Sequence, residues 1–470
     1  MFTFSRAITS SSGKIAFGMM LACGVATTAL AQAAPPAPAP IKAKAVDPGV
    51  RGGAAGAGGP LLNLAGDDLA FFNIAALRFN ETDSVSGGLD VVPPAVSGAG
   101  LGPTFNGNNC AECHAQPAIG GTSPALNPQI ATATLDGAKN TIPPFITANG
   151  PTREARFRTN PDGTPDGGVH DLFVITGRVD AGSCNAVQPN FPQAIANNNI
   201  SFRIPTPLFG LGLVENTPDS NLIADAAAAN PTAFGVSLGV FNRSGNDGTI
   251  MRFGWKAQNK SIMIFAGEAY NVEQGVTNDL FPNERTDTPS CILNGLPEDI
   301  ANVSPNTQTG LTFPASQFSS DVVNFTNFIR LAGAPIPAPP TSTTTTGLAV
   351  FNSIGCATCH VAKHVTSNSA YGGQDFVTYF PYSDFALHDM GAALNDHISQ
   401  GAAIGNQFRT SPLWGIGQRI FFLSDGRTSD LAAAIEDHSG TNSEANTVIN
   451  NFNALTLTQQ QCLLAFLRSL

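Results

Sequence analysis

The chain has 470 residues, of which 42% are apolar and only 12% are charged, and its formal net charge is −11. This length suffices for two or three domains with sizeable cores. A nucleic-acid-binding face needs clustered Lys and Arg, so the acidic, sparsely charged composition argues against nucleic acid as a partner. Gly and Pro, at 48 and 34 residues, exceed ordinary usage and predict a fold rich in loops.

Residues 1–33 have the features of a secretory signal peptide. Arg6 and Lys14 precede a short apolar run, and small-residue cleavage sites follow up to Ala33. The run is too short for a membrane span, and no later run approaches the roughly 20 apolar residues that a span needs. Cys23 leaves a lipoprotein anchor open as an alternative. We expect a periplasmic or secreted protein whose mature chain has no membrane span. Removal of the signal peptide makes the net charge of the chain more negative, and an acidic protein favours a basic redox partner.

Residues 34–47 begin with alternating Pro and Ala, which predicts an extended tether. Next, apolar residues recur at helical spacing over 68–79, and Asp67 is the candidate cap of this amphipathic helix. A Pro-rich and Thr-rich stretch over 335–346 predicts a linker between two domains.

Two further helices are predicted near the C-terminus. Ser429 is expected to cap a helix that runs to Gly440. Thr458 and Gln461 have the spacing of a capping box in front of the last helix, which we expect to pack against the second of two haem domains.

Two Cys-x-x-Cys-His motifs stand 246 positions apart, in separate predicted domains. In such a site the two thiols bind the vinyl groups of a haem covalently, and the adjacent His is the axial iron ligand. A redox Cys pair or a shared zinc site are the alternatives, but neither requires this His in both copies. We predict two haem c groups, held by Cys110, Cys113 and His114, and by Cys356, Cys359 and His360.

The predicted fold is mainly α with long loops and contains two cytochrome c-like haem domains. The first covers 48–334 and is enlarged by a loop-rich insertion, and the second covers 347–470. Outside the motifs and the signal peptide stand Cys184, Cys291 and Cys462. An oxidising compartment permits a disulfide, for which Cys184 and Cys291 are the favoured pair, with three free thiols as the alternative.

Segments that flank the motifs resemble the bacterial di-haem oxidoreductase family, and together they cover most of the mature chain. They are 105–109 (Phe-Asn-Gly-Asn-Asn), 203–213, 252–257, 387–391 (Leu-His-Asp-Met-Gly), 409–415 and 425–427 (Asp-Gly-Arg). The family is also labelled thiol oxidoreductase or peroxidase and is distantly related to the di-haem cytochrome c peroxidases and MauG. The resemblance implies a peroxidase-like enzyme with a reactive first haem and an electron-relay second haem. Calcium is implied by analogy alone.

One residue departs from the family pattern. Where the family commonly has a His before Asp-Gly-Arg, this chain has Ser424, so any role of that His at the second haem is lost or has moved. A relay haem needs two firm protein ligands. Our candidates for a sixth ligand are His388, Met390 and His438, while a surface or hydrogen-bonded role is the alternative for each. Weaker candidates are His170, His364 and His397.

A peroxidase also needs an acid-base group near its open iron. Glu154 and His170 are the candidates, because both lie between the first motif and the middle of the chain. Trp255 and Trp414 both fall in family-like segments, and an indole between two haems could carry electrons. Packing in a core is the more common role of such a side chain.

Three functions are compatible with these features: a peroxidase-like oxidoreductase, a non-catalytic di-haem electron carrier, and a di-haem oxygenase. About 240 residues lie between the motifs, which is enough to build a pocket and therefore favours an enzyme over an electron carrier. We expect a small cytochrome or cupredoxin as redox partner, and peroxide or dioxygen as a small oxidant. The substrate and the oligomeric state are not specified by the sequence.

Overall fold

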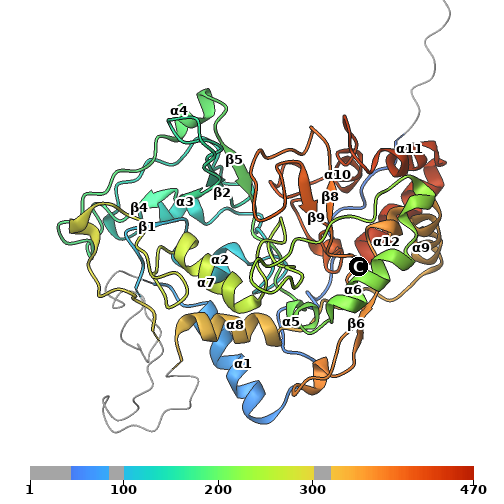
Figure 1. The fold of residues 1–470 in the computed structure, drawn as a ribbon, viewed down its shortest axis with the longest axis horizontal. Helices are drawn as coiled ribbons and strands as arrows, with labels where there is room; N and C mark the ends of the chain where they lie inside the picture. The colour runs from blue at the N-terminus through green and yellow to red at the C-terminus, as the bar shows by residue number, and fades with distance from the viewer. Residues whose placement is uncertain (1–43, 84–99, 301–318) are drawn as a thin grey trace, which may run out of the picture. The chain divides into compact units, whose positions relative to one another are not determined.

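The computed structural model describes residues 44–83, 100–300 and 319–470 (Figure 1). The predicted signal peptide and the tether up to residue 43 lie outside this part. Residues Lys44–Leu470 form one compact unit. The division into two haem domains at 335–346 stays a prediction. Within the described ranges, no helix is both long and apolar enough to cross a membrane.

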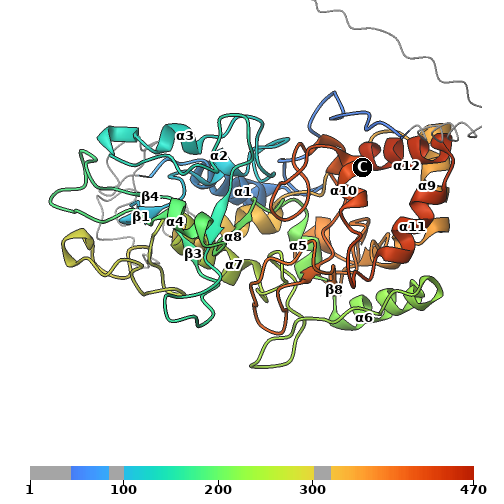
Figure 2. The ribbon, with the colours of Figure 1, turned by 90° about the horizontal axis from the view of Figure 1, so that it is seen from above.

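Short helices joined by long loops build this unit, as the composition predicts (Figures 1 and 2). Before residue 335 the helices are α1 (Gly66–Phe79), α2 (Cys110–Cys113), α3 (Gln129–Thr132), α4 (Phe191–Ala196), α5 (Leu211–Glu215), α6 (Asp219–Ala228), α7 (Ile262–Glu273) and α8 (Asp321–Leu331). After it come α9 (Ser342–Ile354), α10 (Leu431–Glu436), α11 (Asn446–Ala454) and α12 (Leu457–Ser469). Helix α8 packs against α1 and α7, and α12 packs against α9.

The strands are two or three residues long and pair antiparallel. One sheet has the order β3-β2-β5, from β3 (Val169–His170), β2 (Glu154–Arg156) and β5 (Ser201–Arg203). The other pairs are β1 (Thr104–Phe105) with β4 (Phe173–Val174), β6 (His364–Val365) with β7 (Thr378–Tyr379), and β8 (Leu387–Asp389) with β9 (Gln407–Arg409).

Two predicted helix caps are wrong by two residues. The cap of α1 is Ala65, and Asp67 lies in the first turn, where its charge favours the positive end of the helix dipole. The box of α12 is formed by Thr456 and Gln459, not by Thr458 and Gln461. Both Thr-x-x-Gln pairs fit the capping-box pattern, and they are only two residues apart, so the sequence alone does not choose between them.

The helix predicted to run from Ser429 to Gly440 is also shorter than expected. The carboxylate of Asp430, rather than the hydroxyl of Ser429, caps α10 and accepts hydrogen bonds from the amides of Ala432 and Ala433. The helix ends at Glu436, and His438, predicted to lie in its last turn, follows its end.

The Thr-rich part of the predicted linker is helical. The Thr341 hydroxyl and the amide of Thr344 form a capping box, so the Thr run opens α9. This helix ends at Gly355, which has a φ of +103° and directly precedes Cys356. A β-carbon at Gly355 would also lie 2.6 Å from the ring of Phe234. The end of helix α9 therefore fixes the position of the second Cys-x-x-Cys-His motif.

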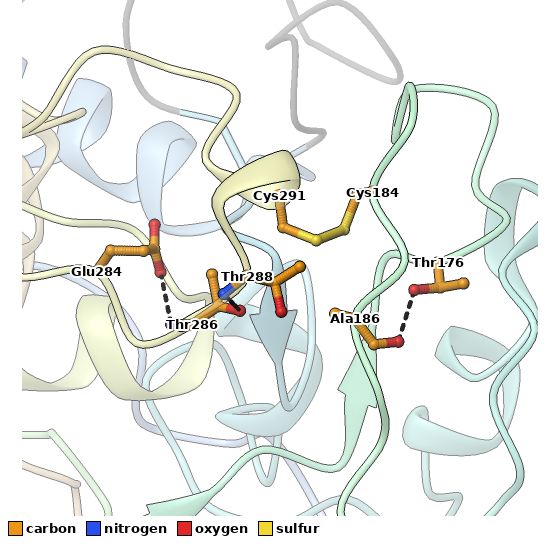
Figure 3. Close-up of a disulfide and its surroundings, with 7 residues drawn as sticks. All are labelled: Thr176, Cys184, Ala186, Glu284, Thr286, Thr288 and Cys291. Atoms are coloured by element: carbon orange, nitrogen blue, oxygen red, sulfur yellow. Dashed lines mark hydrogen bonds between the residues drawn. A yellow bond between two sulfur atoms is a disulfide. The ribbon is translucent and has the colours of Figure 1, made fainter.

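The loops around the first motif are held by a disulfide and a core of their own. Cys184 and Cys291 are bonded to each other across 107 residues (Figure 3), which confirms the favoured pairing, while Cys462 is a half-buried free thiol. The disulfide cysteines belong to a buried cluster that includes Phe105 and Phe173. In the chain-entropy view, a cross-link over about 100 residues stabilises by about 4.7 kcal/mol.

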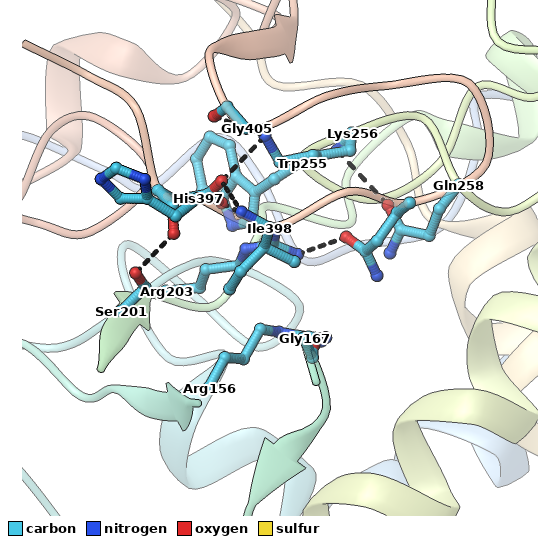
Figure 4. Close-up of polar contacts among 12 residues, drawn as sticks. Arg156, Gly167, Ser201, Arg203, Trp255, Lys256, Gln258, His397, Ile398 and Gly405 are labelled. Atoms are coloured by element: carbon cyan, nitrogen blue, oxygen red, sulfur yellow. Dashed lines mark hydrogen bonds and ion pairs between the residues drawn. The ribbon is translucent and has the colours of Figure 1, made fainter. Parts of the chain in front are cut away.

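A buried network of charges ties the chain before residue 260 to the loop over 395–407. Lys256 is fully buried, and its Nζ lies 2.9 Å from Asp396 and donates to the carbonyl oxygens of Ile404, Gly405 and Gln407. Figure 4 shows Lys256 beside Gly405. Arg203 reaches the same Asp396 carboxylate at 2.9 Å. Both cations thus contact one carboxylate, and these buried ion pairs tie the loop to two earlier segments of the chain.

The close approach of α9 and α12 yields a test of the fold. A β-carbon at Gly347 would lie 2.0 Å from the carbonyl oxygen of Cys462 in α12. We expect Gly347→Ala to push the helices apart and lower the free energy of unfolding by about 1 to 3 kcal/mol, measured by urea denaturation followed by circular dichroism. Gly372→Ala is the control, since nothing lies within 4 Å of its β-carbon position. Equal stability of the two variants would contradict this packing.

Candidate functional site

The first motif is positioned by the end of α1 and the start of α2. The side chain of Asn109 accepts a hydrogen bond from the amide of Glu112 and donates one to the carbonyl oxygen of Asn80. His114 follows α2, and its Nδ1 lies 3.0 Å from the carbonyl oxygen of Gly121. A carbonyl can only accept, so Nδ1 donates, and Nε2 keeps the lone pair that a metal ligand needs.

The second motif has the same arrangement. Cys356 begins a single 3-10 turn after Gly355. The Nδ1 of His360 lies 2.9 Å from the carbonyl oxygen of Tyr382, so Nε2 is again the free ring nitrogen. Burial lowers the pKa of both His114 and His360 to about 4, and both imidazoles are therefore neutral at physiological pH, as iron ligation requires.

Each motif lines a cavity, which we call the first cavity (at Cys110, Cys113 and His114) and the second cavity (at Cys356, Cys359 and His360). Their volumes are about 150 and 220 Å³. All four motif cysteines are free thiols. Two thiols and one neutral imidazole on the wall of each cavity are the donor set that a c-type haem requires, so the residues fit this group. Over the described ranges, no group of three or more His, Cys, Asp or Glu residues could hold a calcium ion.

The first cavity also contains buried carboxylates and guanidinium groups. Glu154 and Arg156 alternate with Ala155 on β2, so their side chains share one face of the strand. Arg156 Nε donates to Glu154 at 2.6 Å, and Glu154 is hydrogen-bonded to Glu273 at the end of α7. Arg203 lines the same cavity from β5 and, like Thr152, carries a buried side-chain atom without a hydrogen-bond partner.

Glu154 and Glu273 share a proton. Burial alone would raise the pKa of Glu154, but Arg156 and Arg203 lower it below its usual value. Burial and repulsion by Glu154 raise the pKa of Glu273 well above its usual value. The pair therefore consists of an ionised Glu154 and a protonated Glu273, which is the arrangement that acid-base chemistry needs.

His170, the other acid-base candidate, lies outside the linings of both cavities. It pairs with Ala155 across the sheet, and so it lies on the face opposite to Glu154. Its ring stacks on Phe157, with 3.7 Å between the ring centres, and its Nε2 lies 2.9 Å from Asp166. The structure thus brings Glu154, but not His170, to the first motif.

The second cavity contains all three candidate sixth ligands. His438 lines it, and its Nδ1 lies 2.7 Å from the carbonyl oxygen of Ala434, which leaves Nε2 free as in His360. The half-buried Met390 lines it as well. In His388 both ring nitrogens are engaged, with Asp384 and Glu444 each at 2.9 Å. His438 and Met390 are therefore better placed than His388 to supply a free donor atom.

The other His candidates are placed elsewhere. His364 is buried, with Asp225 and the carbonyl oxygen of Ser383 each 2.7 Å from a ring nitrogen. His397 is exposed. Neither lines the second cavity.

Trp255 lines both cavities, whereas Trp414 lines neither. The indole of Trp255 is 7% exposed, and its Nε1 donates to the carbonyl oxygen of Ile204 at 3.0 Å. Trp414 belongs to the hydrophobic core, with its ring centre 5.8 Å from that of Tyr379. Trp255 is thus the tryptophan that stands between the two motifs.

Several cavity residues had no signal in the sequence. Glu273, Arg156 and Arg419 line the cavities without belonging to any motif that we singled out. The one available signal for Arg203 was its place in a family-like segment. Ser424, which stands where the family commonly has a His, lines the second cavity, so the departure lies at a position that faces the second motif.

Comparison with known proteins agrees with this geometry. The family described as "Di-haem oxidoreductase, putative peroxidase" matches residues 157–470. The chain belongs to this family. The match includes the second motif, the Trp255 segment and His438, while the first motif precedes it. No curated protein matches the chain. The resemblance that the flanking segments indicated is confirmed, and the family implies haem as the cofactor of this di-haem oxidoreductase.

The shared proton of Glu154 and Glu273 yields a stability test. We expect Glu273→Gln to change the free energy of unfolding at about pH 4 by less than about 1 kcal/mol, because the amide there replaces a carboxyl that is largely protonated in both the folded and the unfolded chain. The double variant Glu154→Gln/Glu273→Gln leaves Arg156 unpaired and should cost about 3 to 5 kcal/mol. Urea denaturation measures both values.

The same pair predicts a dependence on pH. Because the folded pKa of Glu273 is raised, the native protein loses stability as the pH rises through that value. Glu273→Gln lacks this proton, so its stability relative to the wild type should improve with rising pH. If the free energy of unfolding of Glu273→Gln instead fell relative to that of the wild type as the pH rises, the assignment of the proton to Glu273 would be contradicted.

Proposed function

We propose that this chain is an exported, peroxidase-like oxidoreductase with two covalently bound haem c groups. The haem held by Cys110, Cys113 and His114 is reactive, and the haem held by Cys356, Cys359 and His360 relays electrons. The observation that carries this proposal is the difference between the cavities. Among the described residues that line the first, His114 is the one histidine and methionine is absent, whereas the second offers His438 and Met390 besides His360.

When bound, the two haems supply an iron that takes up peroxide and an iron that exchanges electrons. Export supports covalent attachment, because haem is attached to c-type cytochromes outside the cytoplasm, and the disulfide between Cys184 and Cys291 is typical of such a location. The acidic surface favours a basic redox partner, for which a small cytochrome or a cupredoxin has suitable chemistry.

In the first cavity the protein moves the proton. With the haem bound, the ionised carboxylate of Glu154 would accept a proton from one oxygen of hydrogen peroxide and return it to the other, which leaves as water. Two electrons supplied by the haems and two further protons would reduce the remaining oxygen to a second water. Glu273 keeps the pair at one negative charge by holding its own proton. Arg156 and Arg203 place positive charge beside the oxygen atoms, where negative charge develops as the bond between them breaks.

Between the cavities, Trp255 provides an aromatic wall shared by both. Its hydrogen bond to Ile204 fixes the indole, so the electron route does not depend on a mobile side chain. In the second cavity, His438 would be the second protein ligand of the haem iron, since its Nδ1 is engaged with the Ala434 carbonyl oxygen and its Nε2 is free. A firmly ligated iron passes electrons without binding small molecules.

The coordination of the two haems separates the enzyme from a carrier. We expect the wild-type protein to contain two haems per chain by pyridine haemochrome assay, of which one binds cyanide. His438→Ala should raise the cyanide stoichiometry from one to two, because the second iron loses its sixth ligand. Met390→Ala is the matched control and should leave it at one. Two haems that ignore cyanide in every redox state would support the carrier instead.

The acid-base role of Glu154 has its own test. We expect Glu154→Gln to slow the reaction with hydrogen peroxide by about 10²- to 10⁴-fold in stopped-flow measurements, while cyanide binding keeps its stoichiometry. His170→Asn is the control, because His170 lies outside the cavity. An unchanged rate in Glu154→Gln, or an equal loss in His170→Asn, would contradict the assignment of Glu154.

A further inference from the structure

Arg419 presents a guanidinium edge to the second cavity with nothing bound to it. The residue follows a short 3-10 turn and is 5% exposed. Its side chain lines the second cavity, and its Nε and Nη2 are buried without a hydrogen-bond partner. These two nitrogens form the same edge of the guanidinium plane, and together they can donate two parallel hydrogen bonds to one carboxylate.

Among the residues that the structure describes, none forms an ion pair with the guanidinium of Arg419. Burial lowers its pKa to about 10, with no carboxylate opposing this effect. Asp47 is paired with the neighbouring Arg468, whose guanidinium contacts it at 2.5 Å. Arg468 in turn donates to the carbonyl oxygen of Arg419 at 3.0 Å, so the backbone of Arg419 is satisfied while its side chain is not. An unpaired buried charge costs several kcal/mol, which a bound anion would offset.

A second arginine in the same cavity has hydrogen-bond acceptors for its guanidinium group. Arg409 is as deeply buried as Arg419, but its Nε donates to the carbonyl oxygen of Gly254 at 2.8 Å and its Nη1 to that of Thr410 at 3.3 Å. The Asp384 carboxylate also acts on its charge. The free edge is therefore particular to Arg419 and does not follow from burial in this cavity alone.

We propose that Arg419 binds a propionate carboxylate of the haem in the second cavity through its Nε and Nη2. This inference rests on the proposed attachment of a haem at Cys356 and Cys359, since the carboxylate belongs to that group. The pairing would hold the haem through its propionate groups, in addition to the covalent bonds that Cys356 and Cys359 form with its vinyl groups. By compensating a negative charge near the iron, Arg419 also favours the reduced state and raises the midpoint potential of the relay haem.

The test compares Arg419→Gln, Arg419→Lys and Arg409→Gln in the matured full-length protein. We expect Arg419→Gln to lower the midpoint potential of one haem in a spectroelectrochemical titration and to leave the other unchanged. It should also shift one propionate bending band in the resonance Raman spectrum. Arg419→Lys keeps the charge but not the two-pronged edge, so it should retain most of the potential and still shift the band. Arg409→Gln removes a charge from the same cavity and should leave the band in place.

The outcomes are distinguishable. Fewer than two haems in the wild-type protein would overturn the proposed function itself. Two haems with an unshifted propionate band in both Arg419 variants would overturn the inference alone. If Arg419→Gln does not mature, Arg419→Lys still decides, because its band must shift. A wild-type spectrum that depends on added acetate, and loses this dependence in Arg419→Lys, would assign the edge to a free anion and overturn the propionate assignment.

Discussion

The structure around both motifs depends on pairing charges that have been removed from water. Lys256, Arg203 and Asp396 form one such group, and Arg156, Glu154 and Glu273 form another, with Arg203 lining the first cavity beside the second group. Desolvating each ion alone would cost several kcal/mol, so the strands and loops that carry them must keep the partners in contact. These ion pairs hold the loop over 395–407 and the sheet β3-β2-β5. Residues of β2 and β5 line the first cavity, so the same pairs hold part of its wall.

The two cavities show how the same local motif can support different chemistry. In both, a backbone carbonyl accepts from Nδ1 of the motif histidine and orients its Nε2. What differs is the rest of the lining, where the carboxylates of Glu154 and Glu273 line the first cavity and the imidazoles of His388 and His438 line the second. Specialisation therefore resides in residues far from the motif in sequence, such as Glu154 and His438. The haem-binding unit itself is unchanged.

The sequence was informative where the chemistry is local and uninformative where it is not. The two motifs, the mainly α and loop-rich fold, the disulfide partners and the family could be predicted, because each depends on short spacings, composition or contiguous segments. Cap positions failed where equivalent residues stand one or two positions apart, as at Ser429 and Asp430. Glu273 and Arg419 carried no signal, because their roles arise from burial beside groups that meet only in the folded chain. The pleat of β2 and β3, which separates Glu154 from His170, is likewise a tertiary property.

The cysteine arrangement has a consequence for how the protein is made. Cys184 and Cys291 must find each other across 107 residues, whereas the two thiols of each motif are separated by two residues. If the chain is exported and its haems are covalently attached, as we propose, loop-closure entropy favours the short partners, so an oxidant would close the motifs before the distant pair. The motif thiols would then have to stay reduced until the haems are attached, while the distant pair is oxidised. Under this proposal, maturation requires two thiol reactions in one compartment to occur in a defined order.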